Sequence, residues 1–173
     1  MTERRVVFSR EELARRVAEL GEQLTAAYAG RQLVVVGILN GAFVFMADLV
    51  RAIDLPLELD FMRIASYGNA TVSSGELRFT KDVEISLADK DVLLVEDIVD
   101  TGQTLACLKR IMVGHQPRSV KVCALIDKRE RREVEIAVDY AGFVVEEGFL
   151  VGYGLDCAEQ YRNLPGIYHL SRA

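Results

Sequence analysis

The stretch VLLVEDIVDTGQTL, residues 92–105, joins an apolar run to a cluster of acids and a turn of small residues. Glu96 and Asp97 end the apolar run, and Asp100 stands directly before the turn Thr101–Thr104. A carboxylate at the end of a buried strand is costly to desolvate unless it is paired or bound to a ligand. Three such acids so close together therefore indicate a binding site.

Two other apolar runs share this pattern. Residues 33–38 and 119–126 are rich in β-branched residues and continuously apolar, as in strands covered on both faces. Ser9 and Glu12 have the spacing of a helix capping box. Periodic apolar residues predict helices over residues 9–29, 42–53 and 102–113. The order of strands and helices predicts an α/β fold in which helices flank a parallel sheet.

The remaining segments are less regular. Residues 57–67 are predicted to form a strand, and the polar stretch 69–77 a long loop or hairpin tip. After the third buried strand we expect short apolar pieces to form a small hood over the sheet; they lie at residues 141–146, 149–155 and 167–170. No linker separates them from the rest, so residues 1–173 are predicted to form a single domain.

Composition argues against several classes of protein. The net charge of -5 disfavours a general nucleic-acid coat, whose affinity comes from Lys and Arg on phosphates. Cys107, Cys123 and Cys157 have neither CxxC spacing nor partner histidines, so neither a disulfide framework nor a zinc site is indicated. The N-terminus has no apolar stretch of signal length, and the apolar runs are too short to cross a bilayer. We expect a cytoplasmic protein that binds neither nucleic acid nor membrane.

The turn after the central strand suits an anion. If the strand ends near Glu96 and the helix begins near Gly102, the backbone N–H groups of residues 100–104 are unpaired and lie at the positive end of the helix dipole. Thr101 and Thr104 add hydroxyl donors, and Gly102 permits close approach of a phosphate. A phosphate here, with carboxylates one sugar length away, is the pattern that a ribose 5-phosphate requires.

These residues resemble a known family. VLLVEDIVDTGQT is similar to the phosphoribosyl diphosphate motif of the type I phosphoribosyltransferases. GILNGAFVFMADL at 37–49 and FLVGYGLDCAEQYRNLPGIYHL at 149–170 resemble hypoxanthine-guanine phosphoribosyltransferases. With Ser66-Tyr67 and ALIDKRERR at 124–132, the similarity covers nearly the whole chain in order. The resemblance implies a type I phosphoribosyltransferase fold: a parallel sheet flanked by helices, with a small hood from the C-terminal and N-terminal segments.

The resemblance implies a pentosyltransferase of purine salvage. Its substrates would be phosphoribosyl diphosphate and a 6-oxopurine base, hypoxanthine or guanine, and its products IMP or GMP and diphosphate. Mg²⁺ is the implied cofactor, and a homodimer or homotetramer is the implied assembly. In this family the sugar passes through an oxocarbenium-like state, so the protein must hold the leaving group, stabilise the cation and receive a proton from the base.

The same resemblance implies roles around the sugar phosphate. Glu96 and Asp97 match the acids that hold the ribose 2- and 3-hydroxyls, directly or through magnesium. Asp100 matches the general base or hydrogen-bond acceptor at the purine N7. The residues that match the 5'-phosphate cradle are Thr101, Gly102, Gln103 and Thr104.

Further segments are implied to bind the diphosphate. The diphosphate loop is matched by Leu39, Asn40 and Gly41. In this family the loop often contains a cis peptide, and many members carry Lys or Arg in place of Asn40. Asp156 matches a magnesium ligand, and Arg162 matches an arginine that contacts the diphosphate. Ser66 and Tyr67 match the start of a loop that closes over the reaction centre and excludes water.

Three residues are implied to read the base. Lys128 matches the lysine that reads the purine O6, and Phe149 matches the aromatic that stacks on the ring. The backbone of Leu150 matches the group that reads the edge of the base. Arg132 is expected to position either the neighbouring loop or the diphosphate.

Ordinary structural roles compete with some of these assignments. Asp100 would also suit the N-cap of the next helix, Asp156 a turn and Phe149 the core. Arg129 and Arg131 are expected to be solvated surface cations. Two other functions remain open on the same scaffold: a xanthine- or uracil-preferring phosphoribosyltransferase, and a nucleotide-sensing regulator that binds RNA.

Overall fold

The computed structural model describes residues 4–66 and 77–171, with a six-stranded sheet at its centre. The strands lie in the spatial order β4-β3-β2-β5-β6-β7. Their bounds are β2 (Leu33–Leu39), β3 (Leu57–Ser66), β4 (Leu77–Lys81), β5 (Asp91–Val99), β6 (Ser119–Lys128) and β7 (Tyr140–Val145). Neighbouring strands are parallel except for the antiparallel pair β3 and β4. The predicted α/β fold with a mostly parallel sheet is confirmed.

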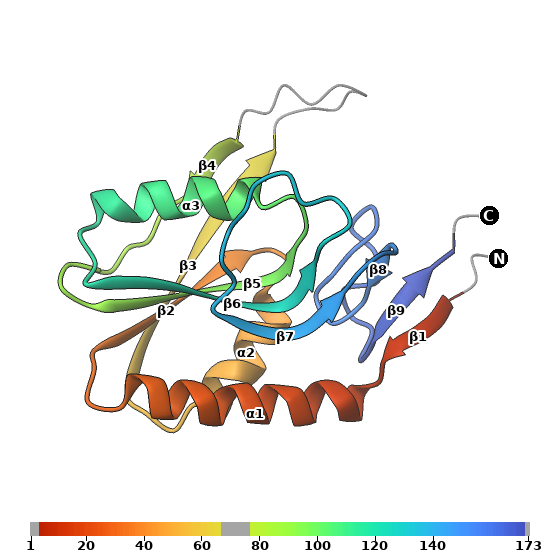
Figure 1. Ribbon diagram of the computed structural model, residues 1–173, viewed down its shortest axis with the longest axis horizontal. Helices are drawn as coiled ribbons and strands as arrows, with labels where there is room; N and C mark the ends of the chain where they lie inside the picture. The colour runs from red at the N-terminus through yellow and green to blue at the C-terminus, as the bar shows by residue number, and fades with distance from the viewer. Residues whose placement is uncertain (1–3, 67–76, 172–173) are drawn as a thin grey trace.

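Helices cover both faces of this sheet (Figure 1). They are α1 (Arg10–Tyr28), α2 (Phe43–Ala52) and α3 (Gln103–Gly114). α1 and α2 lie on one face, and α3 lies on the other. α1 begins at a capping box: Ser9 Oγ accepts a hydrogen bond from the Glu12 backbone N–H at 3.2 Å, and Glu12 Oε2 accepts one from the Ser9 N–H at 2.8 Å. The helix start predicted from the spacing of these two residues is confirmed.

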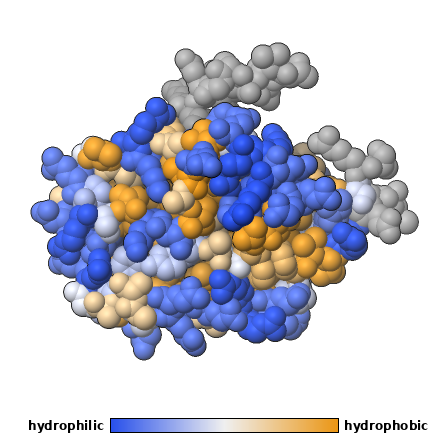
Figure 2. Space-filling view, in the orientation of Figure 1, coloured by the Kyte–Doolittle hydropathy of each residue, from blue (hydrophilic) through white to orange (hydrophobic). Residues whose placement is uncertain are grey.

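Apolar side chains fill the space between the sheet and each helical layer. Leu20 and Phe45 are fully buried under α1 and α2, and Leu108 and Met112 are fully buried under α3. Because β2 and β5 are covered on both faces, residues 33–39 and 92–95 in them form continuous apolar runs. The surface turned to the viewer in Figure 2 is mostly hydrophilic. None of the described helices has the length and apolar character of a membrane span.

A second, three-stranded sheet forms the hood. It contains β1 (Arg4–Phe8), β8 (Leu150–Val151) and β9 (Ile167–Leu170) in the order β1-β9-β8, with antiparallel pairing. The two ends of the chain lie side by side in it (Figure 1). β1 was not predicted as a strand, because its first residues are exposed and its partner β9 lies at the opposite end of the sequence.

Two predicted boundaries are wrong. β5 continues to Val99 instead of ending near Glu96, because its last residues pair with the end of β6. The piece at 141–146, expected in the hood, instead lies almost wholly in β7, which extends the main sheet beside β6. The loop predicted over residues 69–77 lies outside the described residues, apart from its last residue, Leu77, which begins β4.

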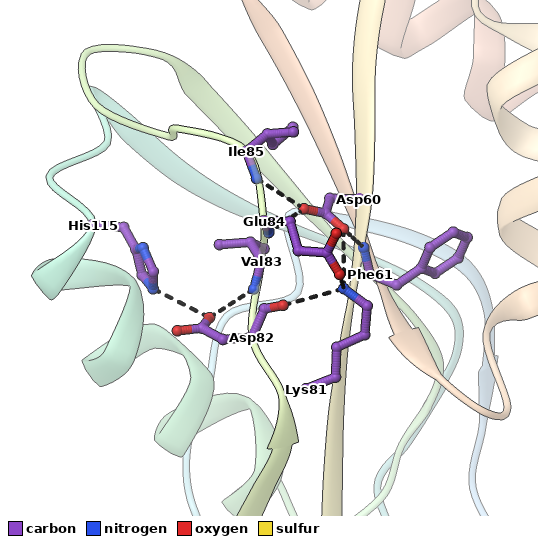
Figure 3. A network of polar contacts seen from close by, with 8 residues as sticks. All are labelled: Asp60, Phe61, Lys81, Asp82, Val83, Glu84, Ile85 and His115. Atoms are coloured by element: carbon purple, nitrogen blue, oxygen red, sulfur yellow. Dashed lines mark hydrogen bonds and ion pairs between the residues drawn. The ribbon is translucent and has the colours of Figure 1, made fainter.

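The side chain of Asp60 anchors the chain after β4 (Figure 3). Its Oδ2 accepts hydrogen bonds from the backbone N–H groups of Glu84 and Ile85 at 2.5 and 3.2 Å, and its Oδ1 accepts one from Phe61 at 2.7 Å. Burial alone would raise the pKa of Asp60, but these donors and the Lys81 ammonium outweigh it and lower the pKa below its usual value. Asp60 is therefore a charged carboxylate that joins β3 to the chain segment after β4.

Candidate active site

The carboxyl ends of the parallel strands all lie at the same end of the sheet. The strand order reverses between β2 and β5. The chain passes from β2 outward to β3 and later returns to β5 on the other side of β2. Ligands of open α/β sheets bind at such a switch point, between the loops that follow the two strands. Here these loops are residues 40–42, after β2, and residues 100–102, after β5. The sequence predicted that both loops bind substrate.

Glu96 and Asp97 lie in β5 beside this switch point. Asp97 is only 8% exposed, and its Oδ1 accepts a hydrogen bond from the Ile98 N–H at 2.9 Å. Glu96 Oε2 is buried and has no hydrogen-bond partner among the described residues. Burial, reinforced by the Asp97 carboxylate, raises the pKa of Glu96 well above its usual range, and burial also raises the pKa of Asp97. The Arg162 guanidinium counters part of the rise at Asp97, and a bound cation or sugar hydroxyls would stabilise the charged form of the pair further.

The turn after β5 leaves the start of α3 open to an anion. Gly102 occupies the N-cap position with φ of 85° and has no side chain to cap the helix. A Cβ at Gly102 would lie 2.5 Å from the Val134 carbonyl oxygen, so both the backbone angle and the close approach require glycine. Thr101 Oγ1 lies 3.4 Å from the Gln103 nitrogen, near the limit of a hydrogen bond. The amides of the first turn are therefore available to a phosphate.

Asp100 is partly buried between this turn and the basic segment after β6. Its Oδ1 is buried and unpaired within the described part of the chain, and its Oδ2 lies 3.5 Å from Arg131 Nη1. Because Gly102 holds the N-cap position, the alternative role of Asp100 as helix cap is wrong. Arg131 is exposed, as expected, but its contact with Asp100 was not predicted. The free oxygen of Asp100 can accept a proton or a hydrogen bond from a ligand.

Arg132 connects the ends of β5 and β6. Its Nε donates to the Asp100 carbonyl oxygen at 3.0 Å, and its Nη2 donates to the carbonyl oxygens of Val99 and Lys128 at 3.2 and 3.0 Å. The same nitrogen pairs with the buried carboxylate of Asp127. Of the two roles expected for Arg132, these contacts favour positioning of the loop.

The loop after β2 lies directly against the acid pair. The peptide bond between Leu39 and Asn40 is cis. A Cβ on Gly41 would lie 1.8 Å from Oδ2 of Asp97, and a Cβ on Gly154 would lie 2.1 Å from the Gly41 carbonyl oxygen. The loop predicted to bind diphosphate is therefore enclosed between β5 on one side and the hood on the other.

Asp156 and Arg162 form an ion pair in the hood, with 2.9 Å between Oδ1 and Nη2. Asp156 Oδ2 accepts a hydrogen bond from the Glu159 N–H at 2.9 Å, so Asp156 also has the turn role considered as its alternative. Arg162 Nη1 donates to the Gly154 carbonyl oxygen at 2.8 Å. These contacts place both side chains beside the part of the hood that touches the diphosphate loop.

Lys128 lies next to Asp100 at the sheet edge. Val99 is paired with Asp127, so the residues that follow them, Asp100 and Lys128, stand at adjacent strand ends. Lys128 is only 6% exposed, and its Nζ lies 3.1 Å from a carboxylate oxygen of Glu130. A buried ammonium at this position is a hydrogen-bond donor that a ligand acceptor could share.

Phe149 precedes β8 in the hood and is 39% exposed. The alternative in which Phe149 belongs to the core is therefore wrong. Leu150 is buried and pairs with His169 in β9. Ser66 ends β3, and Tyr67 lies outside the described residues.

Comparison with known proteins bears on this arrangement. A family model for the phosphoribosyl transferase domain matches residues 7–158, which include the acid pair, the α3 turn and Asp156. The chain belongs to this family. The phosphoribosyltransferase is 51% identical over 163 residues to the bifunctional protein TilS/HprT of Listeria monocytogenes, covering 94% of this chain and 25% of that protein. It thus spans about a quarter of the length of that relative.

Two other relatives match over most of their length. The phosphoribosyltransferase is 47% identical over 163 residues to the hypoxanthine-guanine phosphoribosyltransferase of Bacillus subtilis, covering 94% of this chain and 91% of that protein. A crystal structure of a hypoxanthine phosphoribosyltransferase from Staphylococcus aureus has a TM-score of 0.91 and 42% sequence identity, covering 96% of this chain and 91% of that chain. The fold of the chain is therefore that of this solved structure.

The acids of the phosphoribosyltransferase fit a magnesium ion. Mg²⁺ typically binds one or two carboxylates together with substrate phosphates and waters. The buried, unpartnered Oε2 of Glu96 beside Asp97 is a donor set of this kind. In the described residues, no three acids, histidines or cysteines lie close enough to hold one ion, so Asp156 would bind a metal apart from this pair.

Some contacts of the phosphoribosyltransferase site were missed from the sequence. Asp127 pairs with Arg132, and Tyr153 donates a hydrogen bond to Asp48. The place of Asp127 at the end of a predicted strand, next to Lys128, was a signal that could have indicated a site residue. The contact between Tyr153 and Asp48 had no such signal, because 105 positions separate the two residues.

Proposed function

We propose that this chain transfers the 5-phosphoribosyl group from phosphoribosyl diphosphate to hypoxanthine and guanine in purine salvage, giving IMP or GMP and diphosphate. One observation carries the proposal: Glu96, with its unpartnered Oε2, and Asp97 lie at the switch point between the uncapped start of α3 and the loop at Gly41. The anion site at α3, the two acids and the loop at Gly41 lie in the same order as the 5'-phosphate, the ribose hydroxyls and the diphosphate of phosphoribosyl diphosphate.

The phosphate end is proposed to bind at the turn Thr101–Thr104, where the first amides of α3 meet the positive end of its dipole. The ribose hydroxyls would contact Glu96 and Asp97. Leu39, Asn40 and Gly41 would bind the diphosphate through backbone groups, with Arg162 as the cationic side chain. Ser66 and Tyr67 would begin the loop that excludes water from the reacting sugar.

The base is proposed to bind between the ends of β5 and β6. Lys128 would donate to O6, the acceptor common to hypoxanthine and guanine, and Phe149 would stack on the ring. The backbone of Leu150 would read the edge of the base. As a nitrogen of the base bonds to C1, the bond from C1 to the diphosphate oxygen breaks, and Asp100 accepts the proton at N7. Support for this last role comes from the free Oδ1 of Asp100.

Mg²⁺ is proposed as the cofactor: Glu96 and Asp97 would hold one ion at the sugar, and Asp156 would be a ligand to a second ion on the far side of the diphosphate. When bound, it would neutralise the diphosphate and stabilise its departure. A bound Mg²⁺ would also offset the negative charge of Glu96 and Asp97, whose pKa values are raised without it, so that an anionic substrate could bind beside them.

An assay with a panel of bases tests the proposal. Purified protein with Mg²⁺ and phosphoribosyl diphosphate is offered hypoxanthine, guanine, xanthine, adenine and uracil in turn, and diphosphate release is measured. We expect release with hypoxanthine and guanine. Preference for xanthine or uracil would replace the substrate assignment. No release with any base, together with salt-sensitive RNA binding, would favour the regulator instead.

We also propose a homodimer or homotetramer in the cytoplasm. Phe43 is 45% exposed and lines a cavity of about 710 Å³ formed by α1, α2 and residues 162–165 of the hood, which supports a contact with another copy on this side. The cysteines Cys107, Cys123 and Cys157 are free thiols, which suits a reducing compartment. Light scattering of the purified protein would test the assembly, and a monomeric mass would contradict it.

A further inference from the structure

A hydrogen bond joins two parts of the site that lie far apart in sequence. Tyr153 Oη donates to Oδ2 of Asp48 at 2.5 Å. Asp48 is on α2, the helix that begins two residues after Gly41. Tyr153 stands three residues before Asp156 in the hood. The bond therefore links the helix that follows the diphosphate loop to the segment that carries Asp156.

The hood segment around Asp156 is internally rigid. Gly152 and Leu155 exchange two backbone hydrogen bonds of 3.0 Å. The N–H groups of Tyr153 and Gly154 donate to carbonyl oxygens of the returning chain at 2.9 and 3.0 Å. β8, which leads into the segment, pairs with β9 and has no place in the six-stranded sheet. Contacts with the main body therefore set where this preformed segment lies.

Tyr153 provides such a contact in a protected environment. Its ring is 7% exposed and belongs to the core under α1 and α2. Burial first, and then the bond to Asp48, raises the pKa of the Tyr153 hydroxyl, so the group is a donor at physiological pH. A buried phenol hydroxyl requires an acceptor, and Asp48 supplies it. The next residue, Gly154, lies directly against the carbonyl oxygen of Gly41.

We propose that Tyr153 is a positioning residue for the diphosphate and metal end of the substrate, with Asp48 as its anchor. Their hydrogen bond keeps Gly154 in contact with Gly41 and thereby sets the distance from Asp156 to the diphosphate loop. The inference rests on the proposed phosphoribosyl transfer and deepens it at one end of the substrate. The base end, at Lys128 and Phe149, is not held by this bond.

The substitution Tyr153→Phe tests the proposal because it removes the hydroxyl and keeps the ring. We expect the KM for phosphoribosyl diphosphate to rise about three- to tenfold, the effect of one net hydrogen bond. The Mg²⁺ concentration for half-maximal activity should rise in parallel, while the KM for the base stays unchanged. Calorimetric titration of phosphoribosyl diphosphate with Mg²⁺, in the absence of base, should show the same loss of affinity without turnover.

Matched variants separate positioning from stability. Asp48 is 38% exposed, so Asp48→Ala should fold, and it should reproduce the Tyr153→Phe defect. Asp48→Asn should restore affinity because its amide oxygen still accepts the bond. Tyr28→Phe is the control for loss of a buried hydroxyl: the Tyr28 hydroxyl is buried without a hydrogen-bond partner in the described residues. Tyr28→Phe should keep the wild-type KM.

Two results would overturn the inference. One is an unchanged affinity for phosphoribosyl diphosphate in both Tyr153→Phe and Asp48→Ala. The other is an equal loss for base and phosphoribosyl diphosphate with a lowered melting temperature, which would make the bond purely structural. A wild-type protein that released no diphosphate with any base would instead overturn the proposed function.

Discussion

Single carboxylates are the candidate chemical groups of this site because the fold leaves some of their oxygens without partners. Glu96 Oε2 and Asp100 Oδ1 are buried and unpaired within the part of the chain that the structure describes. Buried polar atoms of native proteins are normally hydrogen-bonded, so each such atom is a candidate for contact with a ligand. Asp97 and Asp156 differ, because each already accepts a backbone hydrogen bond that orients it before a ligand binds.

Asp100→Asn should separate turnover from substrate binding. The amide cannot take a proton, so we expect kcat to fall by about 100-fold or more, the range of general base catalysis. The KM for phosphoribosyl diphosphate should change little, because the acids proposed to contact the ribose, Glu96 and Asp97, lie earlier in β5 and are unchanged. Steady-state kinetics measures both constants. An unchanged kcat would remove the proposed base, and Arg131→Gln controls for loss of the ion pair to Asp100.

Asp156→Asn should weaken magnesium-dependent binding. The amide oxygen can still accept from the Glu159 N–H, but the charge toward the metal is lost. We expect the half-saturating Mg²⁺ concentration to rise about tenfold, as for other losses at metal sites. Glu159→Gln is the control, because Glu159 also pairs with Arg162 yet is 78% exposed. A Mg²⁺ titration that matches wild type would exclude Asp156 as a ligand.

At the scale of secondary-structure elements, single charged side chains link neighbouring strands of the main sheet. The ends of β5 and β6 carry Asp100 and Lys128, and Arg132 hydrogen-bonds to the backbone of both strands. Asp60, within β3, joins that strand to the chain after β4 in the same way. In each case one charged group that is at least partly buried hydrogen-bonds to several backbone groups, so its loss should affect two elements.

Arg132→Met should destabilise the fold and the site together. It leaves three carbonyl oxygens without this donor and the Asp127 carboxylate without its closest cation. We expect the free energy of unfolding to fall by about 2–4 kcal/mol, measured by urea denaturation. Arg129→Met is the control: its side chain is 60% exposed, 3.6 Å from Asp127, and such surface pairs contribute at most about 1 kcal/mol. Equal losses in the two variants would contradict the assigned role.

Asp60→Asn should change the stability of the protein in a pH-dependent way. The folded-state pKa of Asp60 is below its usual value of 3.8, so its stabilising contribution is present above that value and is lost as the pH falls through the folded-state pKa. At pH 7 the variant should be less stable by about 1–3 kcal/mol, and the difference should vanish in strong acid. Urea denaturation at several pH values measures this.

Asp82→Asn provides the control for the Asp60 experiment, because Asp82 is in the same network but is 54% exposed (Figure 3). Its substitution should change the free energy of unfolding by much less. A stability difference for Asp60→Asn that did not depend on pH would contradict the charged role of Asp60.

The molecule as a whole brings three separate parts together at one point. The main sheet supplies Asp97, the loop after β2 supplies Gly41, and the hood supplies Gly154. The hood itself depends on both ends of the chain, since β1 pairs with β9. The proposed binding of substrate would therefore depend on contacts among segments that no local element contains.

Gly41→Ala tests this convergence. Its Cβ would lie 1.8 Å from the Asp97 carboxylate, so the loop or the acid must move. We expect the affinity for phosphoribosyl diphosphate to fall by at least about tenfold, in line with the loss of a contact at a metal site. Gly114→Ala is the matched control, because a Cβ there meets nothing within 4 Å. Wild-type affinity in Gly41→Ala would show that the close packing is not required.

Local patterns predicted most of the elements and the turn chemistry. The apolar runs of β2, β5 and β6 and the capping box of α1 depend on neighbours in the chain, so they can be recognised without a structure. The motif at residues 92–105 and its resemblance to phosphoribosyltransferases also indicated the residues that lie along the sheet edge. These features are determined by the sequence itself, because side-chain period and turn residues act over a few positions.

Only the tertiary structure decided the contacts between distant residues. It extended β5 by pairing it with β6, placed residues 141–145 of an expected hood piece in the main sheet, and formed β1 through a partner at the other end of the chain. It also joined Tyr153 to Asp48 and brought Gly154 against Gly41. Strand pairing and close packing depend on which segments meet in space, and that information is absent from any short stretch of sequence.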